Sequence, residues 1–424
     1  MDNSASFFKN TECSYFPCHK NINQDDFNCL FCYCPLYSKN PCPGNPTYIK
    51  KEDGRLIKRC TDCVFPHKPE NYQKIMNLLR ARKDVPPAGE YNHGKELFSV
   101  NINPLGLPEN VKEYIKNAIS SLDLCEKYPD YNCTNLKKKL SDWLSVKVLP
   151  DNIVFGNGAS ELISLAVNAI SPKDALLLAP TFSGYERALK ICDCRVHHYY
   201  LKEENDFAVC GDILEAVSKI SPDMIFLCNP NNPTGRMIDK NLFERMLDLC
   251  EEKGIFLFVD ECFIDFTERA DETALRFLEK SPHLIVLNAF TKIFAMAGLR
   301  LGYLVSSNSG LLQKINSLRP EWNVSAVAQF AGEKMLDECD YVAKTRELVK
   351  KERDFLVKKL KALGFRAFSG EANFILFKSE LKKEIPFLRS CANFKGLDGN
   401  FYRTSVRTHA ENEGLVEKLE KLFS

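Results

Sequence analysis

Hydrophobic residues gather in short continuous runs along much of the chain. The runs at 153–155, 224–228, 255–259 and 284–287 contain only Ile, Val, Leu, Phe, Met and Cys. Continuous rather than alternating apolar character is typical of parallel strands that helices cover on both faces. After the first run, apolar residues recur with the spacing of one helix face, at Leu162, Ile163, Leu165, Ala166 and Ala169. The pattern therefore predicts an α/β fold with a mostly parallel sheet.

Polar residues follow these runs directly. Lys292 comes after the run at 284–287, Asp260 follows the run at 255–259, and Asn232 lies in the Pro- and Asn-rich turn at 229–235. Ligands of open α/β sheets bind just outside the carboxyl ends of the strands. We therefore expect these three side chains to line one site.

The chemistry of these residues suits a phosphorylated aldehyde cofactor. A lysine at a strand end can bond covalently to the aldehyde of pyridoxal phosphate, and Arg300, eight residues later, can hold the phosphate with two hydrogen bonds. Asp260 can pair with the pyridine nitrogen and keep it protonated, so that the ring accepts electrons. A single lysine would more simply be a surface residue, but its neighbours reverse that interpretation.

Further cofactor contacts are expected from two other segments. The helix after the run at 153–155 begins near Gly158, Ala159 and Ser160, where free N–H groups can bind a phosphate. Phe182 can stack on the ring, and Asn232 can hydrogen-bond its phenolic oxygen.

In this order and spacing, the motifs resemble the fold-type-I pyridoxal-phosphate enzymes over residues 90–424. The nearest resemblance is to the L-threonine-O-3-phosphate decarboxylases of cobalamin synthesis, which are relatives of histidinol-phosphate aminotransferase. The matching segments are 101–106, 127–130, 260–266, 322–326 and 389–399. The resemblance implies a large domain with a seven-stranded, mostly parallel sheet and a small α+β domain. We expect a cysteine-rich module at 1–85, an arm at 86–125, the large domain at 126–320 and the small domain at 321–424.

The resemblance also assigns roles to residues outside the strand ends. It places Arg403 and Arg389 against the anionic groups of the substrate, and two arginines suit a carboxylate and a phosphate ester. It adds Thr291 to the phosphate contacts and makes Tyr128 cross a homodimer interface to the partner's cofactor. Further substrate contacts, besides Asn232, are expected from His93, Gly94 and Asn101.

The implied reaction is decarboxylation of L-threonine O-3-phosphate to (R)-1-aminopropan-2-ol phosphate, used for the nucleotide loop of cobalamin. Phe263 favours it over transamination, because the related aminotransferases usually carry a tyrosine there. Ala289 departs from both families, which commonly offer a phosphate-binding hydroxyl at that position. The alternatives are a histidinol-phosphate-type aminotransferase and an L-serine phosphate decarboxylase, whose substrate differs by one methyl worth about 1–3 kcal/mol.

The first 85 residues are rich in cysteine and predict a metal-binding module. Two Cys-x2-Cys pairs lie within a segment of Pro, Asn and aromatic residues, a pattern typical of metal sites. Zinc is expected first, and an iron–sulfur cluster is the alternative, since sets of four thiolates bind either. A disulfide framework competes with both. The candidate ligands are Cys13, Cys18, His19, Cys29, Cys32, Cys34, Cys42, Cys60, Cys63 and His67.

The composition of the chain argues against some classes of binding partner. The 57 basic residues nearly balance the 56 acidic ones, which argues against a broad nucleic-acid surface. The chain opens without a basic-then-apolar leader, and no run approaches 18 apolar residues, so we expect a cytoplasmic protein outside the membrane. The module at 1–85 could dock a cobalamin-pathway partner. A rival from another class is a pyridoxal-binding regulator with a DNA- or protein-binding module, but no basic recognition helix supports it.

Overall fold

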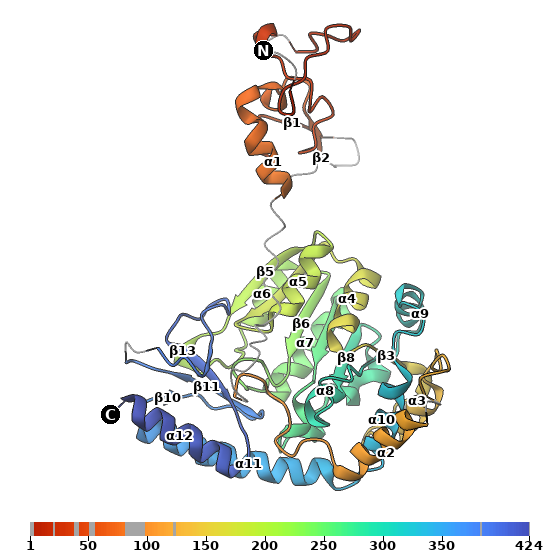
Figure 1. The fold of residues 1–424 in the computed structure, drawn as a ribbon, viewed down its shortest axis with the longest axis vertical. Helices are drawn as coiled ribbons and strands as arrows, with labels where there is room; N and C mark the ends of the chain where they lie inside the picture. The colour runs from red at the N-terminus through yellow and green to blue at the C-terminus, as the bar shows by residue number, and fades with distance from the viewer. Residues whose placement is uncertain are drawn as a thin grey trace. The chain divides into compact units, whose positions relative to one another are not determined.

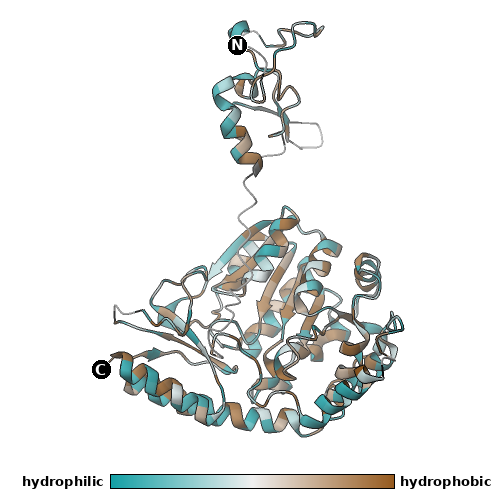
Figure 2. Cartoon of the chain, in the orientation of Figure 1, coloured by the Kyte–Doolittle hydropathy of each residue, from teal (hydrophilic) through white to brown (hydrophobic). Residues whose placement is uncertain are grey.

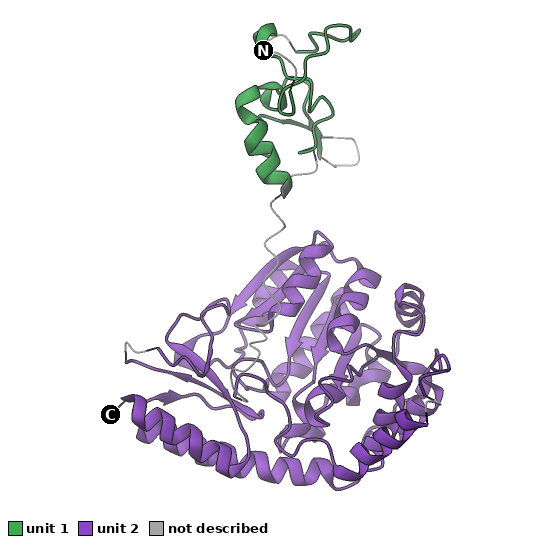
Figure 3. Ribbon diagram, in the orientation of Figure 1, with its two compact units in different colours: residues 1–85 green, residues 86–424 purple. Residues whose placement is uncertain are grey.

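The computed structural model describes residues 4–19, 22–37, 42–50, 56–80, 98–121, 124–381 and 384–423. The chain forms two compact units, Met1–Val85 and Pro86–Ser424 (Figure 3). His93 and Gly94 lie outside the described residues. The predicted boundaries at 125 and 320, within the second unit, stay predictions.

The first unit has little regular structure. Strands β1 (Thr47–Lys50) and β2 (Leu56–Arg59) form an antiparallel pair, and helix α1 (Tyr72–Arg80) follows two short 3-10 turns, η2 (Phe65–His67) and η3 (Pro69–Asn71). A further turn, η1, spans Gln24–Asp26. Its fully buried apolar side chains are few among the described residues, namely Phe27, Leu36 and Ile75. So small a core supplies little folding free energy by itself.

The second unit is built on a seven-stranded sheet (Figure 1). Its strands are β3 (Ile153–Gly156), β4 (Asp174–Ala179), β5 (Arg195–Tyr200), β6 (Met224–Cys228), β7 (Phe256–Asp260), β8 (Leu284–Ala289) and β9 (Gly302–Val305), in the order β3-β9-β8-β7-β6-β4-β5. Only β9 runs antiparallel to its neighbours. All the other strands therefore end at the same edge of the sheet.

Helices connect the strands and cover the sheet. They are α4 (Ala159–Ile170), α5 (Ser183–Ile191), α6 (Ile213–Ile220), α7 (Lys240–Lys253), α8 (Phe290–Ile293) and α9 (Ser309–Leu318). Every residue of β6 and β8 is buried, and Figure 2 shows the central strands in the brown of hydrophobic residues. The predicted runs thus became interior strands of a mostly parallel sheet, because only burial on both faces accommodates continuous apolar sequence.

The carboxyl-terminal part adds helices and a smaller sheet. Helix α11 (Tyr341–Ala362) packs against a four-stranded antiparallel sheet in the order β10-β11-β13-β12, and α12 (His409–Phe423) packs against α11. The strands of this sheet are β10 (Arg366–Ala367), β11 (Phe374–Lys378), β12 (Arg389–Ser390) and β13 (Phe401–Ser405). This part also contains helix α10 (Ala326–Leu336). Helices α2 (Glu109–Ser120) and α3 (Thr134–Trp143) pack against α10. The predicted fold class, including the cysteine-rich module, is confirmed.

A strap at 98–106 ties the two sheets together. The backbone N–H of Ser405 donates to the carbonyl of Phe98 at 2.9 Å, and that of Asn103 donates to the carbonyl of Lys292 at 3.1 Å. The strap therefore reaches from the small sheet to the end of β8. No helix among the described residues is long and apolar enough to span a membrane.

Candidate active site

The carboxyl edge of the large sheet holds a cavity of about 290 Å³. Segments that follow β3, β4, β6, β7 and β8 all reach it, because those strands end together. The strap and the small sheet close the other side. The predicted site residues that line it are Asn101, Ala159, Ser160, Phe182, Asn232, Asp260, Thr291, Lys292, Arg300, Arg389 and Arg403.

Lys292 lies in the short helix α8 directly after β8. The Asn103 side chain donates to the carbonyl of Ile293 at 2.6 Å, which braces this helix from the strap. The Lys292 ammonium lies 5.9 Å from the ring centre of Phe263. Burial, followed by the positive charge of Arg403, lowers the pKa of Lys292 to about 8. At pH 7 roughly a tenth of these amines are therefore unprotonated and nucleophilic, far more than for a lysine with its ordinary pKa.

Asp260 ends β7 and is held at both carboxylate oxygens. The Tyr185 hydroxyl donates to Oδ2 at 2.6 Å, and the backbone N–H of Cys262 donates to Oδ1 at 3.0 Å. Only 6% of Asp260 is exposed, and this burial raises the pKa of its carboxyl group. A buried carboxylate is unfavourable without a neighbouring cation. The protonated pyridine nitrogen of the expected cofactor would be such a cation, and it would favour the ionised form of Asp260.

The start of α4 forms a cradle with Arg300. Gly158 has φ +78°, and a Cβ there would lie 2.5 Å from Arg300 Nη2. A Cβ at Gly302 would lie 2.9 Å from the nitrogen of Ala159. These two glycines therefore let the guanidinium and strand β9 approach the first N–H groups of α4. A helix start beside a guanidinium is a good site for a phosphate.

Arg403 and Arg389 face each other across strands β13 and β12, where they are register partners. Arg403 is 8% exposed, and it donates to Asn232 Oδ1 at 2.5 Å and to the carbonyl of Ser99 at 2.8 Å. Burial lowers the pKa of Arg403 to about 10. No carboxylate pairs with either arginine among the described residues. Two unneutralised guanidiniums on neighbouring strands repel each other, so the arrangement favours an anionic ligand.

Two buried polar atoms at the cavity lack partners. Asn101 is 2% exposed and its Oδ1 has no hydrogen-bond partner in the described structure, nor has Nε of the buried Arg403. An unpaired buried polar group costs about 1–3 kcal/mol, so both atoms favour a ligand that would pair with them.

Other predicted residues fall elsewhere. Tyr128 is 78% exposed and stacks on Trp322 with ring centres 4.3 Å apart, away from this cavity. In the first unit, Cys32 N–H donates to the carbonyl of Cys29 and Cys63 N–H to that of Cys60, both at 3.1 Å. These are the turns of the two Cys-x2-Cys pairs, and their roles as ligands stay predictions.

Sequence reasoning missed Tyr185 and Cys262. Tyr185 is completely buried in α5, three residues after Phe182, and its ring stacks on Phe226 at 4.9 Å. A buried tyrosine in an amphipathic helix normally packs in the core, so nothing in the sequence indicated that its hydroxyl holds Asp260. Cys262 acts through its backbone N–H, which no side-chain pattern reveals.

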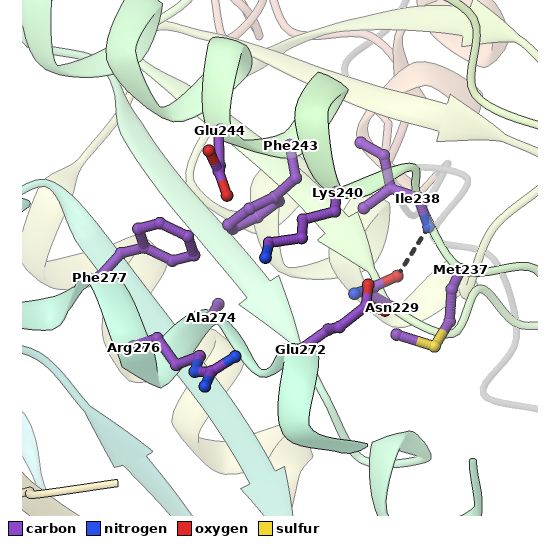
Figure 4. A pocket seen from close by; sticks show the side chains of 10 residues that line it. All are labelled: Asn229, Met237, Ile238, Lys240, Phe243, Glu244, Glu272, Ala274, Arg276 and Phe277. Atoms are coloured by element: carbon purple, nitrogen blue, oxygen red, sulfur yellow. Dashed lines mark hydrogen bonds between the residues drawn. The ribbon is translucent and has the colours of Figure 1, made fainter. Parts of the chain in front are cut away.

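A second hollow lies between α7 and the 3-10 helix η8 (Ala274–Lys280), and Figure 4 shows its lining. Lys240 and Arg276 are balanced there by Glu244 and Glu272, and Glu272 is already bound by Arg269 at 2.6 Å. The side chain of Asn229 accepts a hydrogen bond from the Ile238 N–H at 3.0 Å, the dashed line in Figure 4. None of the predicted site residues lines this hollow, so the candidate active site is the cavity at Lys292.

Comparison with known proteins assigns both parts of the chain to families. Residues 94–418 match the family described as aminotransferase class I and II. The chain belongs to this family. Residues 4–86 match a family described as cysteine-rich small domain. The predicted resemblance of both parts is therefore confirmed.

Relatives in the aminotransferase class I and II family carry two different activities in their names. Threonine-phosphate decarboxylase of Salmonella typhimurium is 34% identical over 340 residues, covering 77% of this chain and 91% of the relative. Histidinol-phosphate aminotransferase of Ruminiclostridium cellulolyticum is 28% identical over 359 residues, covering 81% and 98%. A crystal structure of histidinol-phosphate aminotransferase from Clostridium acetobutylicum matches with TM-score 0.70 and 32% identity, covering 77% and 98%. The family shows the fold, and the reaction has to be argued from the site.

Proposed function

We propose that the second unit binds pyridoxal phosphate and decarboxylates L-threonine O-3-phosphate to (R)-1-aminopropan-2-ol phosphate. The observation that carries the proposal is the pair of unneutralised arginines, Arg389 and Arg403, beside an amine with a lowered pKa. The 34% identity to a relative named threonine-phosphate decarboxylase supports the same substrate.

The donor set fits the cofactor. The start of α4 at Ala159 and Ser160, with Arg300 and Thr291, would hold its phosphate. Lys292 would bond to its aldehyde carbon. Asp260, whose pKa is raised by burial, would keep a proton on the pyridine nitrogen, and Tyr185 orients that carboxylate. Asn232 and Phe182 would contact the phenolic oxygen and the ring face.

The bound cofactor supplies an electron sink for the bond that breaks at the substrate's α-carbon. Arg403 and Arg389 bind the carboxylate and the phosphate ester, and the burial of Arg403 excludes water from the charge that it binds. The Asn101 oxygen that lacks a partner accepts a hydrogen bond from the substrate. Lys292, with its lowered pKa, would deliver the proton that replaces the lost carboxylate on the α-carbon.

A substrate panel tests this proposal. L-threonine phosphate should be consumed, and L-threonine should be poor because one arginine then binds nothing. L-serine phosphate should be slower by the contribution of one methyl group, about 10- to 200-fold. Equal turnover of L-threonine and L-threonine phosphate would contradict the phosphate-binding role of the arginines.

Transamination of histidinol phosphate is the second candidate function. It is favoured by the 32% identity and 98% coverage of the solved histidinol-phosphate aminotransferase. That substrate carries a phosphate but no carboxylate, so it would occupy only one of the two arginines. Conversion of histidinol phosphate at a higher kcat/KM than L-threonine phosphate would replace the first proposal with this one.

We also propose a homodimer, in which Tyr128 reaches the cofactor phosphate of the partner subunit. The exposed stack of Tyr128 on Trp322 supports it, since large aromatic residues that water contacts are typical of interfaces. Analytical sedimentation would measure the oligomeric state. A fully active monomer would contradict the shared site.

For the first unit, we propose that thiolates hold at least one metal ion, with zinc as the first candidate. Its small core and its two Cys-x2-Cys turns support a structural ion. Docking of a cobalamin-pathway partner would be a further role of the same unit in the cytoplasm.

A further inference from the structure

Three of the ten candidate ligands in the first unit converge in the structure. The ligand atoms of Cys18, His19 and His67 all lie within 4.8 Å of one another. The rings of His19 and His67 have centres 4.7 Å apart. The sequence does not group these residues, since His67 lies 48 positions after His19. Folding of the first unit brings them together.

His67 is oriented for ligation rather than for packing alone. It is 2% exposed, and its Nδ1 lies 2.9 Å from the carbonyl oxygen of Asn28. Because a carbonyl only accepts, Nδ1 carries the proton and Nε2 keeps its lone pair. Histidine ligands of metals commonly have the second nitrogen fixed by a carbonyl in this way.

Asn28 is itself held firmly. It is 1% exposed, its N–H donates to the His67 carbonyl at 2.8 Å, and its side chain donates to the carbonyl of Ser6 at 2.9 Å. Its Oδ1 accepts from the N–H groups of Phe8 at 3.1 Å and Leu30 at 3.0 Å. The residue that orients His67 is thus tied to three segments, as expected for the support of a ligand.

The remaining face of His67 is also fixed. The fully buried ring of Phe27 stacks on it with centres 4.6 Å apart, and Phe16 packs edge-on against Phe27 at 5.4 Å. Cys32 lines the same hollow as His19 and His67, and it lies on the segment that follows Asn28. Among the thiols that line this hollow, Cys32 is the nearest to Asn28 along the chain.

We infer that Cys18, His19 and His67 bind one divalent metal ion, with Cys32 in the fourth position, as a mixed nitrogen–sulfur site distinct from an iron–sulfur cluster. Two imidazoles and two thiolates are a tetrahedral zinc set, whereas the common iron–sulfur clusters take four thiolates. This inference deepens the proposed metal-binding role of the first unit and is independent of the decarboxylase proposal.

Cobalt substitution of the full chain tests the ligand set. Metal-free protein would be titrated with Co²⁺ under anaerobic conditions, with ion content and the visible absorption of Co²⁺ as readouts. His67→Gln should bind one ion fewer per chain than the wild type. Cys125→Ser, an exposed thiol in the second unit, should bind the wild-type number.

A ligand exchange separates loss of a ligand from loss of the fold. His67→Cys should keep the ion, and its absorption should gain intensity from an additional thiolate. An unchanged ion count and spectrum in His67→Gln would overturn the site. Loss of the ion in His67→Cys, or iron with acid-labile sulfide as the only metal of anaerobically purified protein, would overturn it equally. If the first unit bound no metal at all, the result would be different, because the wild-type chain itself would then bind no Co²⁺.

Discussion

The two units of this chain organise their polar residues by different means. In the second unit, seven strands and their covering helices place Lys292, Asp260 and Arg300 around one cavity, and the apolar interior supplies the folding free energy. In the first unit, only a few apolar side chains are fully buried, and the thiols and imidazoles lie in turns. The fold of the second unit thus positions the proposed catalytic residues without the help of a ligand. We expect the first unit, in contrast, to depend on the proposed metal ion for its fold.

Replacing a Cys-x2-Cys pair should produce the largest difference in behaviour between the two units. Cys60→Ser with Cys63→Ser should unfold the first unit, because a structural zinc contributes on the order of 10 kcal/mol of folding free energy. Limited proteolysis should then cleave residues 1–85, while the cofactor absorbance of the second unit stays unchanged. Parallel loss of both would contradict the independence of the units. Cys125→Ser with Cys339→Ser, two exposed thiols, is the matched control.

Removing the amine of Lys292 should have the largest effect within the second unit. Lys292→Ala should lower kcat by on the order of 10³-fold or more, since no other amine lines the cavity among the described residues. The absorbance of covalently bound cofactor should disappear. Lys240→Ala, in the second hollow, should leave both properties unchanged. Covalent cofactor that survives in Lys292→Ala would refute the assignment.

Replacing each of the two arginines should lower kcat/KM by a different factor. Arg403→Ala removes a hydrogen bond to a charged group worth about 1.5–3 kcal/mol, so kcat/KM for L-threonine phosphate should fall about 10- to 150-fold. Arg389→Ala should cost less, because its side chain is less buried and held by Ser390 and Asn393. Neither change leaves an unpaired acid behind, and relief of the repulsion between the two guanidiniums should offset the lost bonds of Arg403 to Asn232 and Ser99, so thermal stability should change little. A large drop in melting temperature would mean that the pair has a structural role.

Lys292 should also make stability depend on pH in the cofactor-free chain. Its pKa falls from 10.5 to about 8 on folding, first through burial. Well below pH 8 the amine is protonated in both the folded and the unfolded state, so the free-energy cost of burying its charge is fully present. Between pH 8 and 10.5 the unfolded state binds the extra proton, so this contribution to stability rises with pH. Lys292→Met should therefore stabilise the chain by about 3 kcal/mol at pH 7 and by almost nothing near pH 10.5. An equal gain at both values, measured by urea unfolding, would count against the lowered pKa.

Some of this site could be predicted from the sequence because strand ends converge. Lys292, Asp260 and Asn232 each follow a continuous apolar run, and parallel strands end at one edge. The meeting of Arg389 with Arg403 depends on the register of β12 and β13, which spacing alone does not fix. The support of Asp260 by Tyr185 depends on which way one helical side chain points. The convergence of Cys18, His19 and His67 depends on a loop-rich fold that hydrophobic periodicity does not describe.

The central claim is that the bond from the α-carbon to the carboxylate breaks. L-threonine phosphate carrying an isotopic label in its carboxyl group would be incubated with the cofactor-loaded chain, without any 2-oxo acid. We expect labelled carbon dioxide to be released over many turnovers, with one molecule of aminopropanol phosphate formed for each molecule of carbon dioxide. Retention of the label in an organic product, with turnover only when 2-oxoglutarate is added and converted to glutamate, would contradict it and make the chain an aminotransferase.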